Sequence, residues 1–507
     1  MSVTMSEAVP PAVGFSDWPV RFVARVTLEL TSAIVVRASS LSASAPTDFV
    51  RDANGLPALP GTSLCGALRH AYGDYLRSTG RSATDADHQT AVIFGASGDV
   101  DGSASRFSIS WGRIHDGENH VIDGLFGPED PRLLCPVLLN ARQGARRDRV
   151  RINQRGTADG LGKFEDLVIS AGHRFTFDMG LRGDVQDNGV WQSLLDFLCD
   201  PDIRLGAGTR HGLGAIRVHR LGAKAFNLRQ YSDYEAFCRL PVGLGREADL
   251  PDVATRAHGK RQRIVAVLKG LRPTTPWVFG GGIPEAEEAT APVAEAMILW
   301  DGDRGAPSSQ PLQFIPATSV KGVLAHRLAW HYNRLTGYRV VPGQRLDIRN
   351  EAVATLLGFV APDSNAEAAS QREAKAQGRR GMLMLGDIVL REPASTQVVH
   401  HVSLDRFSGG ARNGMLFSER VLTTDSLSYD YEITLLPPPE PEAVAKPIRH
   451  ALAATLEDVR KGRLAFGAGT GRGNGRFQCD GVEWSDGGQW IDRGLRTNQH
   501  NEESSHG

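Results

Sequence analysis

The sequence predicts an α+β protein built from two tandem ferredoxin-like domains, each with the element order βαββαβ and with inserts. Three features occur twice, in the same order and at nearly one spacing, which indicates duplication of a whole domain. The repeats lie about 256, 252 and 261 residues apart and are marked by Ser63 and Ser319, by Val150 and Val402, and by Gly206 and Gly467. Such a sheet carries helices on one face and leaves the other free for a ligand, as in RNA-recognition modules.

The composition limits the classes of partner. The 507 residues suffice for two or three domains, and a hydrophobic content of 41% is typical of a globular protein. The 57 basic and 58 acidic residues give a net charge of -1, so any nucleic-acid surface must be local. The five cysteines lie far apart without a CxxC pair, which argues against a zinc site or a disulfide framework and favours a reducing cytoplasm. Neither a membrane-spanning apolar run nor a signal peptide is expected.

The first domain is predicted at 20–240, after a disordered lead at 1–19. Residues 20–37 alternate between apolar and polar side chains, which is typical of a half-buried strand. A loop follows, and then a capped helix is expected from about 62 to 78. A polar, glycine-rich insert at 79–130 comes next.

The same domain continues with a basic loop and two strands within 146–183. A short helix is predicted at 190–200, and a glycine-rich turn leads into a last strand at 204–220.

After a linker at 241–262 the pattern restarts in a second domain at 263–485, which precedes a disordered tail at 486–507. The predicted elements, in order, are a strand at 263–279, a helix at 317–335, a counterpart of the basic stretch at 398–422, a strand at 427–437, a helix at 448–462, and a glycine-rich loop with the last strand at 463–479.

Each first helix has the same expected start. Pro60 and Pro316 bias the preceding residue toward extended geometry, and the Thr-Ser pairs that follow are good N-caps. Glycines one turn into each helix allow a backbone or a phosphate to come close. A helix N-terminus with free N–H groups is an anion site, although an ordinary capped helix is the alternative for either copy alone.

These motifs together resemble the RAMP superfamily, and the chain is similar to two fused backbone subunits of a CRISPR type III interference complex. The carrying stretches are VRDANGLPALPGTSLCGALR, FGASGDVDGSASRFSI, RVRINQRGTADGLGKFEDLVI and RLGAGTRHGLGAIRV, and then FIPATSVKGVLAHR, HHVSLDRFSGGARNGMLFSERVL and LAFGAGTGRGNGRF. The resemblance extends from about residue 20 to about residue 485. It implies a cytoplasmic antiviral protein that lies along a CRISPR guide RNA beside other subunits and helps capture a complementary target RNA.

The resemblance and the residue chemistry together give a set of RNA-binding candidates. Helix starts and lysine hold phosphates, glycine-rich loops expose N–H groups, and arginines add bidentate contacts. The candidates are Thr62, Ser63, Arg69, Arg149, Arg151, Gly208, Arg210, His211, Thr318, Ser319, Lys321, Arg327, Gly469, Arg472 and Arg476. Cys65 occupies the place of Lys321 in the first half, where Arg69 is the substitute. The alternatives are a solvated lysine, tight structural turns and a solvated basic loop.

The family also implies metal-dependent RNA cleavage, with magnesium needed only if the chain is catalytic. Family members use an Asp about six residues before a structural Asp, which Asp52 resembles, and that position is Pro46 here. Asp48 lies two residues off register, so either it is the catalytic residue of a shortened loop or this half is inactive. The second-half carboxylates have no clear family context; they are Glu285, Glu287, Glu288, Asp301 and Asp303.

The sequence therefore favours a subunit that binds guide RNA and captures target RNA, with cleavage through Asp48 as a further hypothesis. One alternative is a purely structural subunit of the same complex. Another is a guide-processing endoribonuclease that uses His70, His211 or His326, although no histidine lies in the loop between the first strand and the first helix. A tandem ferredoxin-like protein unrelated to RNA is favoured only by the near-zero net charge. The inserts at 79–130 and 359–381 are left without an assigned role.

Overall fold

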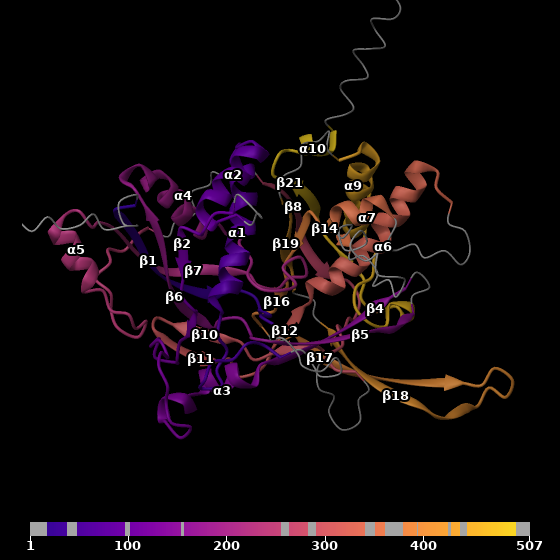
Figure 1. Cartoon of the computed structure of the whole chain (residues 1–507). Coiled ribbons are helices and arrows are strands. Elements are labelled where there is room, and N and C mark those ends of the chain that lie inside the picture. The colour runs from indigo at the N-terminus through magenta and orange to yellow at the C-terminus, as the bar shows by residue number, and fades with distance from the viewer. Residues whose placement is uncertain are drawn as a thin grey trace, which may run out of the picture.

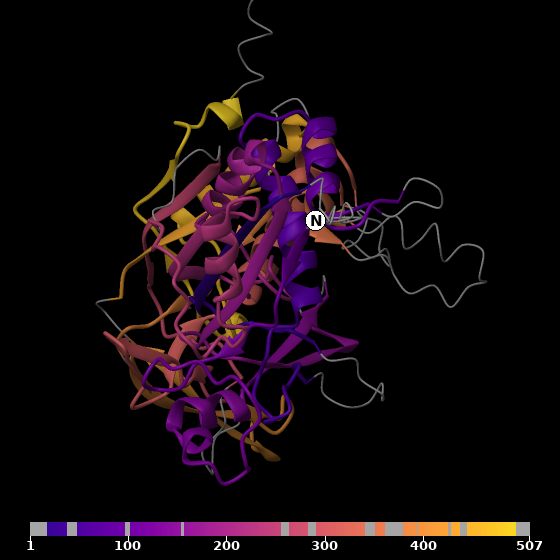
Figure 2. The same cartoon turned by 60° about the vertical axis from the view of Figure 1, so that its left-hand side comes forward.

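The chain folds into two α+β halves, as the sequence predicts, and Figure 1 shows them side by side in a computed structural model. The first half comes forward in Figure 2. The structure describes residues 18–37, 48–96, 102–153, 157–254, 263–281, 290–339, 350–359, 379–392, 394–423, 427–436 and 444–492.

The first sheet is antiparallel and centres on β1 (Val20–Leu30). β1 pairs with β6 (Arg174–Gly183) on one side and with β7 (Ile216–Asn227) on the other. Two short strands, β2 (Phe107–Ile109) and β3 (Arg113–Ile114), continue the sheet beyond β6. Every second residue from Val20 to Leu28 is buried, because alternate side chains of a strand point to one face.

Helices cover that buried face. The main ones are α1 (Gly61–Ser78), α2 (Ala83–Phe94) and α4 (Asn188–Leu198). The ring of Trp191 on α4 lies 5.6 Å from that of Phe22 on β1, and Tyr72 on α1 lies 5.3 Å from Phe197 on α4. The remaining helical segments are η1 (Pro131–Leu134), α3 (Pro136–Gln143), η2 (Val185–Asp187) and α5 (Tyr231–Cys238).

The second half repeats this strand order. Its sheet runs β15 (Leu383–Leu385), β19 (Tyr429–Leu435), β8 (Ile264–Pro273) and β20 (Phe477–Gln478), and β21 (Gly481–Trp484) also pairs with β8. Its helices are α6 (Ala317–Thr336), α7 (Glu351–Leu356), α9 (Lys446–Arg460) and α10 (Gln489–Asp492), with η4 (Thr470–Arg472) in the loop before β20.

Residues 486–492, which the sequence analysis placed in the tail, are part of the second half. Trp490 on α10 is buried, and its carbonyl oxygen accepts a hydrogen bond from Arg449 on α9. Residues 1–17 and 493–507 lie outside the described residues.

Each half also carries a long hairpin outside its main sheet. The first joins β4 (Ala145–Ile152) to β5 (Ala158–Val168), and the second joins β17 (Ser395–Leu404) to β18 (Ala411–Thr423). The expectation of a basic loop at 146 was wrong, because the arginine run forms strand β4. Figure 1 shows the second hairpin projecting away from the body.

Short strands complete the second half. They are β9 (Ala294–Glu295), β10 (Ile298–Asp301), β11 (Arg304–Pro307), β12 (Leu312–Ile315), β13 (Gly358–Phe359), β14 (Arg379–Arg380) and β16 (Ile388–Val389). The β10–β11 hairpin contacts the first half, since the Ile298 amide donates to the Ala171 carbonyl at 3.0 Å. The Trp300 indole N–H donates to the Gly172 carbonyl at 2.7 Å. The insert at 79–130 contains α2, β2 and β3.

Among the described helices, none combines the length and apolar character that crossing a lipid bilayer requires.

Candidate nucleic-acid interface

The two glycine-rich loops have the same backbone shape. Each contains four glycines with positive φ at equivalent places, namely Gly206, Gly208, Gly212 and Gly214, and Gly467, Gly469, Gly473 and Gly475. A Cβ on Gly214 would lie 1.9 Å from the Leu205 carbonyl oxygen, and one on Gly475 would lie 2.1 Å from that of Phe466. Only glycine avoids both the strained φ and this collision.

Matching hydrogen bonds anchor both loops to the chain that follows the first strand of each half. The Ala207 amide donates to the Val35 carbonyl at 2.8 Å, and the Ala468 amide donates to the Val278 carbonyl at 2.7 Å. At the two glycines predicted to contact RNA, neighbouring side chains already occupy the nearby space. A Cβ on Gly208 would meet Leu213, and one on Gly469 would meet Asn474.

The first loop lies between the two halves. Gly212 forms a parallel bridge with Gly386, and the Arg210 guanidinium donates to the Leu436 carbonyl at 3.3 Å. Arg210 is 8% exposed. This predicted RNA-contact residue therefore supports the contact between the halves.

Two basic residues from different halves, His211 and Lys321, come together at this place. Burial, followed by Lys321 and Arg149, lowers the pKa of His211 to about 4. Burial, followed by Arg210, lowers the pKa of Lys321 to about 8. The surroundings thus disfavour positive charge on both side chains, so a negatively charged group placed here would relieve the repulsion.

We expect His211 to make folding less stable in mild acid. Its folded pKa of about 4 lies below the ordinary value of about 6.5, so the unfolded chain binds the proton more readily. The contribution of neutral His211 is present above pH ~6.5 and is lost as the pH falls toward 4. Urea titrations at pH 7 and 5 measure the difference, and His211→Gln should reduce it.

The exposed His70 supplies the matched control, since the pH 7 to pH 5 difference should fall more in His211→Gln than in His70→Gln. An equal difference in His211→Gln and the unsubstituted chain would contradict the prediction.

The helix starts differ from the sequence-based expectation. Pro60 and Pro316 occupy the N-cap positions, without a side-chain cap, so the prediction that the Thr-Ser pairs are N-caps was wrong. Proline fixes an extended backbone at the N-cap, so the helix begins at the next residue. The Thr-Ser pairs therefore lie within the first turn. Thr62 and Ser63 are exposed there, whereas Thr318 and Ser319 are half-buried.

Space is open beside the first turn of both helices. Apart from the backbone of its own helix and its two chain neighbours, no atom of the described residues lies within 4 Å of where a Cβ on Gly66 or Gly322 would be. Close approach of a ligand to α1 and α6 is therefore sterically permitted at these glycines.

Arg69 and Arg327 lie in different surroundings. Arg69 lines a cavity of about 270 Å³ together with Arg77, Asp74 and Arg380. Arg327 donates to Asp458 at 2.5 Å, within an internal network of the second half.

His331 and Arg463 complete that network at 2.8 and 3.0 Å from Asp458. Although burial raises the pKa of Asp458, hydrogen bonds from Arg327, His331 and Arg463 lower it to about 2. The charge of Arg327 is thereby compensated within the fold.

Ion pairs also compensate much of the basic run. Arg146 pairs with Asp148 and Glu165, and Arg149 pairs with Asp166. Arg151 is exposed on β4, and Arg155 lies outside the described residues. The local positive charge of this hairpin is lower than the sequence alone indicates.

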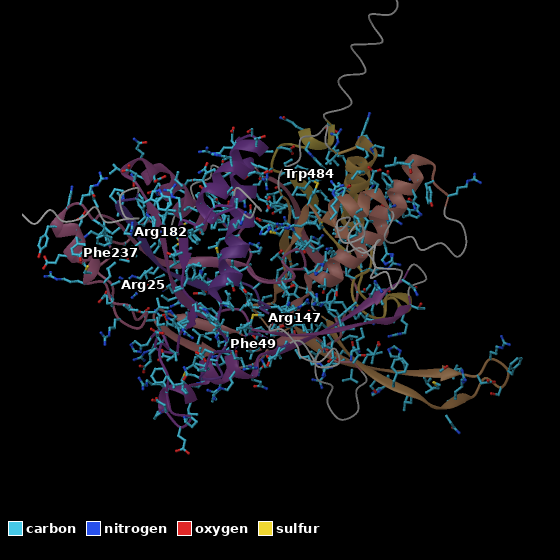
Figure 3. All side chains as sticks on the ribbon, viewed as in Figure 1. Arg25, Phe49, Arg147, Arg182, Phe237 and Trp484 are labelled. Carbon is cyan, nitrogen blue, oxygen red and sulfur yellow. The ribbon has the colours of Figure 1, made fainter. Side chains whose placement is uncertain are left out.

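Arg147 is the buried member of this run. Its guanidinium bridges to Glu295 and to Asp387, the latter at 2.6 Å, and it lies 4.5 Å from the Phe314 ring. Figure 3 shows Arg147 between the halves. Sequence reasoning missed this role because both carboxylates belong to the other half.

The second glycine-rich loop is more open. Arg472 is 44% exposed in its side chain and pairs with Glu419, and Arg476 is exposed. Gly473 has open space around a hypothetical Cβ. Of the two loops, this one presents its arginines to solvent.

The β17–β18 hairpin presents an apolar surface that the sequence analysis missed. Its large exposed residues are Val398, Val402, Leu404, Phe407, Met415, Leu416 and Phe417. Arg406 lies 4.6 Å from the Phe407 ring, and Asp405 accepts hydrogen bonds from the Phe407 and Ser408 amides to close the tip. Apolar residues in an otherwise polar ribbon were the available signal.

The two carboxylates in the loop between the first strand and α1 differ in their surroundings. Asp48 is 50% exposed and pairs with Arg51 at 3.2 Å. Asp52 closes a turn by accepting from the Asn54 and Leu56 amides at 2.8 and 3.0 Å. Pro46, Glu285, Glu287 and Glu288 lie outside the described residues.

The described residues contain no cluster of three or more His, Cys, Asp or Glu side chains able to hold a metal. Asp303 accepts a hydrogen bond from Asn119, across the contact between the halves. The candidate histidines do not come together either, since His70 and His326 are exposed on different helices and His211 lies at the contact.

Comparison with known families gives one match. A model described as the RAMP superfamily matches residues 27–217 and 271–478, one region in each half. No curated protein matches the chain.

Proposed function

Since the chain belongs to the RAMP superfamily, we propose that it is a backbone subunit of a type III CRISPR effector complex. Domains of this superfamily generally take part in CRISPR-associated complexes. In this role the chain binds guide RNA, contacts other subunits and helps capture a complementary target RNA in the cytoplasm. Each half is a ferredoxin-like domain in this proposal, which the shared strand order β2-β6-β1-β7 and β15-β19-β8-β20 supports.

The observation that carries the proposal is that both halves contain a glycine-rich loop of the same backbone shape and a first helix with open space beside its first turn. Backbone N–H groups and a nearby cation are the usual ligands of phosphate. Lys321 is the strongest single candidate, because a phosphate would replace the solvation that burial has removed from its ammonium group. The exposed Phe407 ring of the second hairpin adds a surface on which a base can stack.

We expect Lys321→Met to weaken guide-RNA binding and to lower the slope of log affinity against log salt by about 1, as loss of one phosphate contact predicts. Methionine keeps the apolar stem and removes the charge. Fluorescence anisotropy with labelled guide RNA at several salt concentrations gives both quantities.

Lys224→Met on the outer strand β7 is the matched control and should leave the slope unchanged. Equal slopes for Lys321→Met and the unsubstituted chain, with unchanged melting temperatures, would remove Lys321 from the interface.

Target cleavage by the first half is a further proposal. A magnesium ion needs several oxygen ligands, and the described residues contain no cluster of three or more His, Cys, Asp or Glu side chains, while Asp48 is already paired with Arg51. These residues alone do not form a magnesium site, so no step through a metal is derived from them.

A direct test uses the assembled complex with a labelled complementary transcript, with and without magnesium. Asp48→Ala is expected to abolish one cleavage position while binding stays intact, and Asp184→Ala, at an exposed aspartate of the same half, is the control. Unchanged cleavage in Asp48→Ala refutes its role.

The purely structural alternative is favoured by the Asp48–Arg51 pair, because an ion-paired carboxylate is less available to a metal. It predicts tight binding with an intact transcript. Metal-independent cutting of precursor guide RNA that depends on a histidine would instead indicate a processing enzyme.

A further inference from the structure

A cavity of about 270 Å³ lies where α1 and α2 of the first half meet β14 of the second. We call it the arginine cavity, because Arg69, Arg77 and Arg380 line it. Arg380 reaches it from the second half and donates a hydrogen bond to Asp74 on α1 at 3.3 Å. Both halves therefore contribute cations to one cavity.

The helical spacing of α1 explains why space is open between two of these arginines. Arg69, Gly73 and Arg77 are four residues apart, so they lie on one face of the helix. Gly73 has no side chain to fill the gap between them. A Cβ at this position would lie 3.5 Å from a guanidinium nitrogen of Arg77 and 3.5 Å from the Thr90 hydroxyl oxygen. The glycine thus leaves both groups accessible from the cavity.

The charges around the arginine cavity do not balance. Arg77 pairs with Asp74 and with Asp87, each at 2.8 Å, and Asp74 is shared with Arg380. Arg69 has no ion-pair or hydrogen-bond partner among the described residues. Three guanidinium groups therefore face two carboxylates. Because the Asp87 side chain is 72% exposed, water screens much of its charge, and the cavity favours an anion.

The two carboxylates orient the arginines without using most of their donors. A guanidinium group has five N–H donors in a fixed plane. Arg77 donates two hydrogen bonds to the carboxylates, and Arg380 donates one. The remaining N–H groups, with all those of Arg69, are available to a ligand. Paired N–H donors of this kind match the oxygen atoms of a phosphate group.

The arginine cavity is not part of the repeated guide-RNA interface. In α6 of the second half, the positions that correspond to the two arginines and the glycine of α1 hold Ala325, Asn333 and Ala329. A contact that served a regular RNA backbone would be expected in both halves. The cavity therefore fits a ligand that binds once per chain.

We propose that the arginine cavity binds a terminal phosphate group, as carried by a mononucleotide or by the end of an RNA. A terminal phosphate has close to two negative charges at pH 7 and three strong acceptor oxygens, whereas each backbone phosphodiester has one negative charge. Three guanidinium groups complement the first better than the second. The cavity volume is near the lower end of the range for small-molecule sites, which suits a phosphate with a small body attached.

The test is isothermal titration calorimetry of the full chain without guide RNA. Adenosine monophosphate should bind with a Kd between about 10 μM and 1 mM, and adenosine, which lacks the phosphate, should not bind. An RNA tetramer with a 5′-phosphate is compared with the same tetramer carrying a 5′-hydroxyl. Tighter binding of the phosphorylated tetramer assigns the cavity to an RNA end, and binding of the mononucleotide alone assigns it to a free nucleotide.

Three variants locate the site. Arg69→Gln and Arg380→Gln should each weaken binding of adenosine monophosphate by about 10-fold to 100-fold, through loss of charged hydrogen bonds. Gly73→Ala keeps every charge and favours the helix, but its methyl group enters the gap beside Arg77 and should weaken binding on the order of 10-fold. Arg391→Gln, at an exposed arginine outside the cavity, is the control and should bind as the unsubstituted chain does.

Melting temperatures without ligand check that each variant is folded, and Gly73→Ala tests the site even if an arginine variant is unstable. Equal binding of adenosine and its monophosphate overturns the proposal, as does equal binding of the two tetramers. Affinities that are the same in Arg69→Gln, Gly73→Ala, Arg380→Gln and the unsubstituted chain overturn it too. Because these titrations contain no guide RNA, their outcome is independent of the tests of the proposed function.

Discussion

Replacing Arg147 with alanine is expected to destabilise the chain by about 3–5 kcal/mol, the usual cost of removing one partner from a buried ion pair. The Arg147 side chain is 11% exposed, and its partners Glu295 and Asp387 are 2% and 4% exposed. Without the guanidinium, two carboxylates remain buried near each other. Urea unfolding at pH 7 should show the loss.

The neighbouring Arg146 provides a matched control. It pairs with Asp148 and Glu165 but is 59% exposed in its side chain, so Arg146→Ala should have little effect on stability. A similar small cost for Arg147→Ala would show that the ion pairs between the halves contribute little to stability.

Substituting Gly475 with alanine is expected to cost about 2–5 kcal/mol, from the strain of a positive φ and from a collision in the core. Its φ is +78°, and the added Cβ would lie 2.1 Å from the Phe466 carbonyl oxygen. Because Phe466 is buried and its amide donates to the Gly475 carbonyl at 2.7 Å, the added Cβ requires the loop to shift. Thermal and urea unfolding measure the effect.

Gly473 in the same loop separates the two causes. Its φ is +93° with no atom of the described residues within 4 Å of the hypothetical Cβ, so Gly473→Ala pays the backbone strain alone, about 1 kcal/mol. Equal costs at Gly473 and Gly475 would mean that steric contact does not determine the loop geometry.

The parts of the fold that the sequence predicted depend on local pattern and on repetition. The first helix was expected at 62–78 and runs Gly61–Ser78. The glycine-rich loops were recognised from their spacing, and glycine is the residue that a positive φ selects. Both signals are local in the chain.

The parts that escaped prediction depend on distant partners. The arginine run was interpreted as a basic surface. In the fold, however, Arg147 pairs with Glu295 and Asp387, which lie 148 and 240 residues further along the sequence. Arg327 likewise meets Asp458, 131 positions away. A single sequence does not reveal which basic residues such partners neutralise, so the uncompensated positive charge was overestimated.

The pairing of the first strand with the last in each half also determines when that half can fold during synthesis on the ribosome. The first strand of the first half pairs along its length with the last, Val20 with Asn227, so that sheet is complete once residue 227 has emerged. Arg147 gains its first carboxylate partner only when Glu295 has been synthesised, and its second with Asp387. At about 5–20 residues per second, the finished first half therefore presents an uncompensated cation for a time on the order of 10 s.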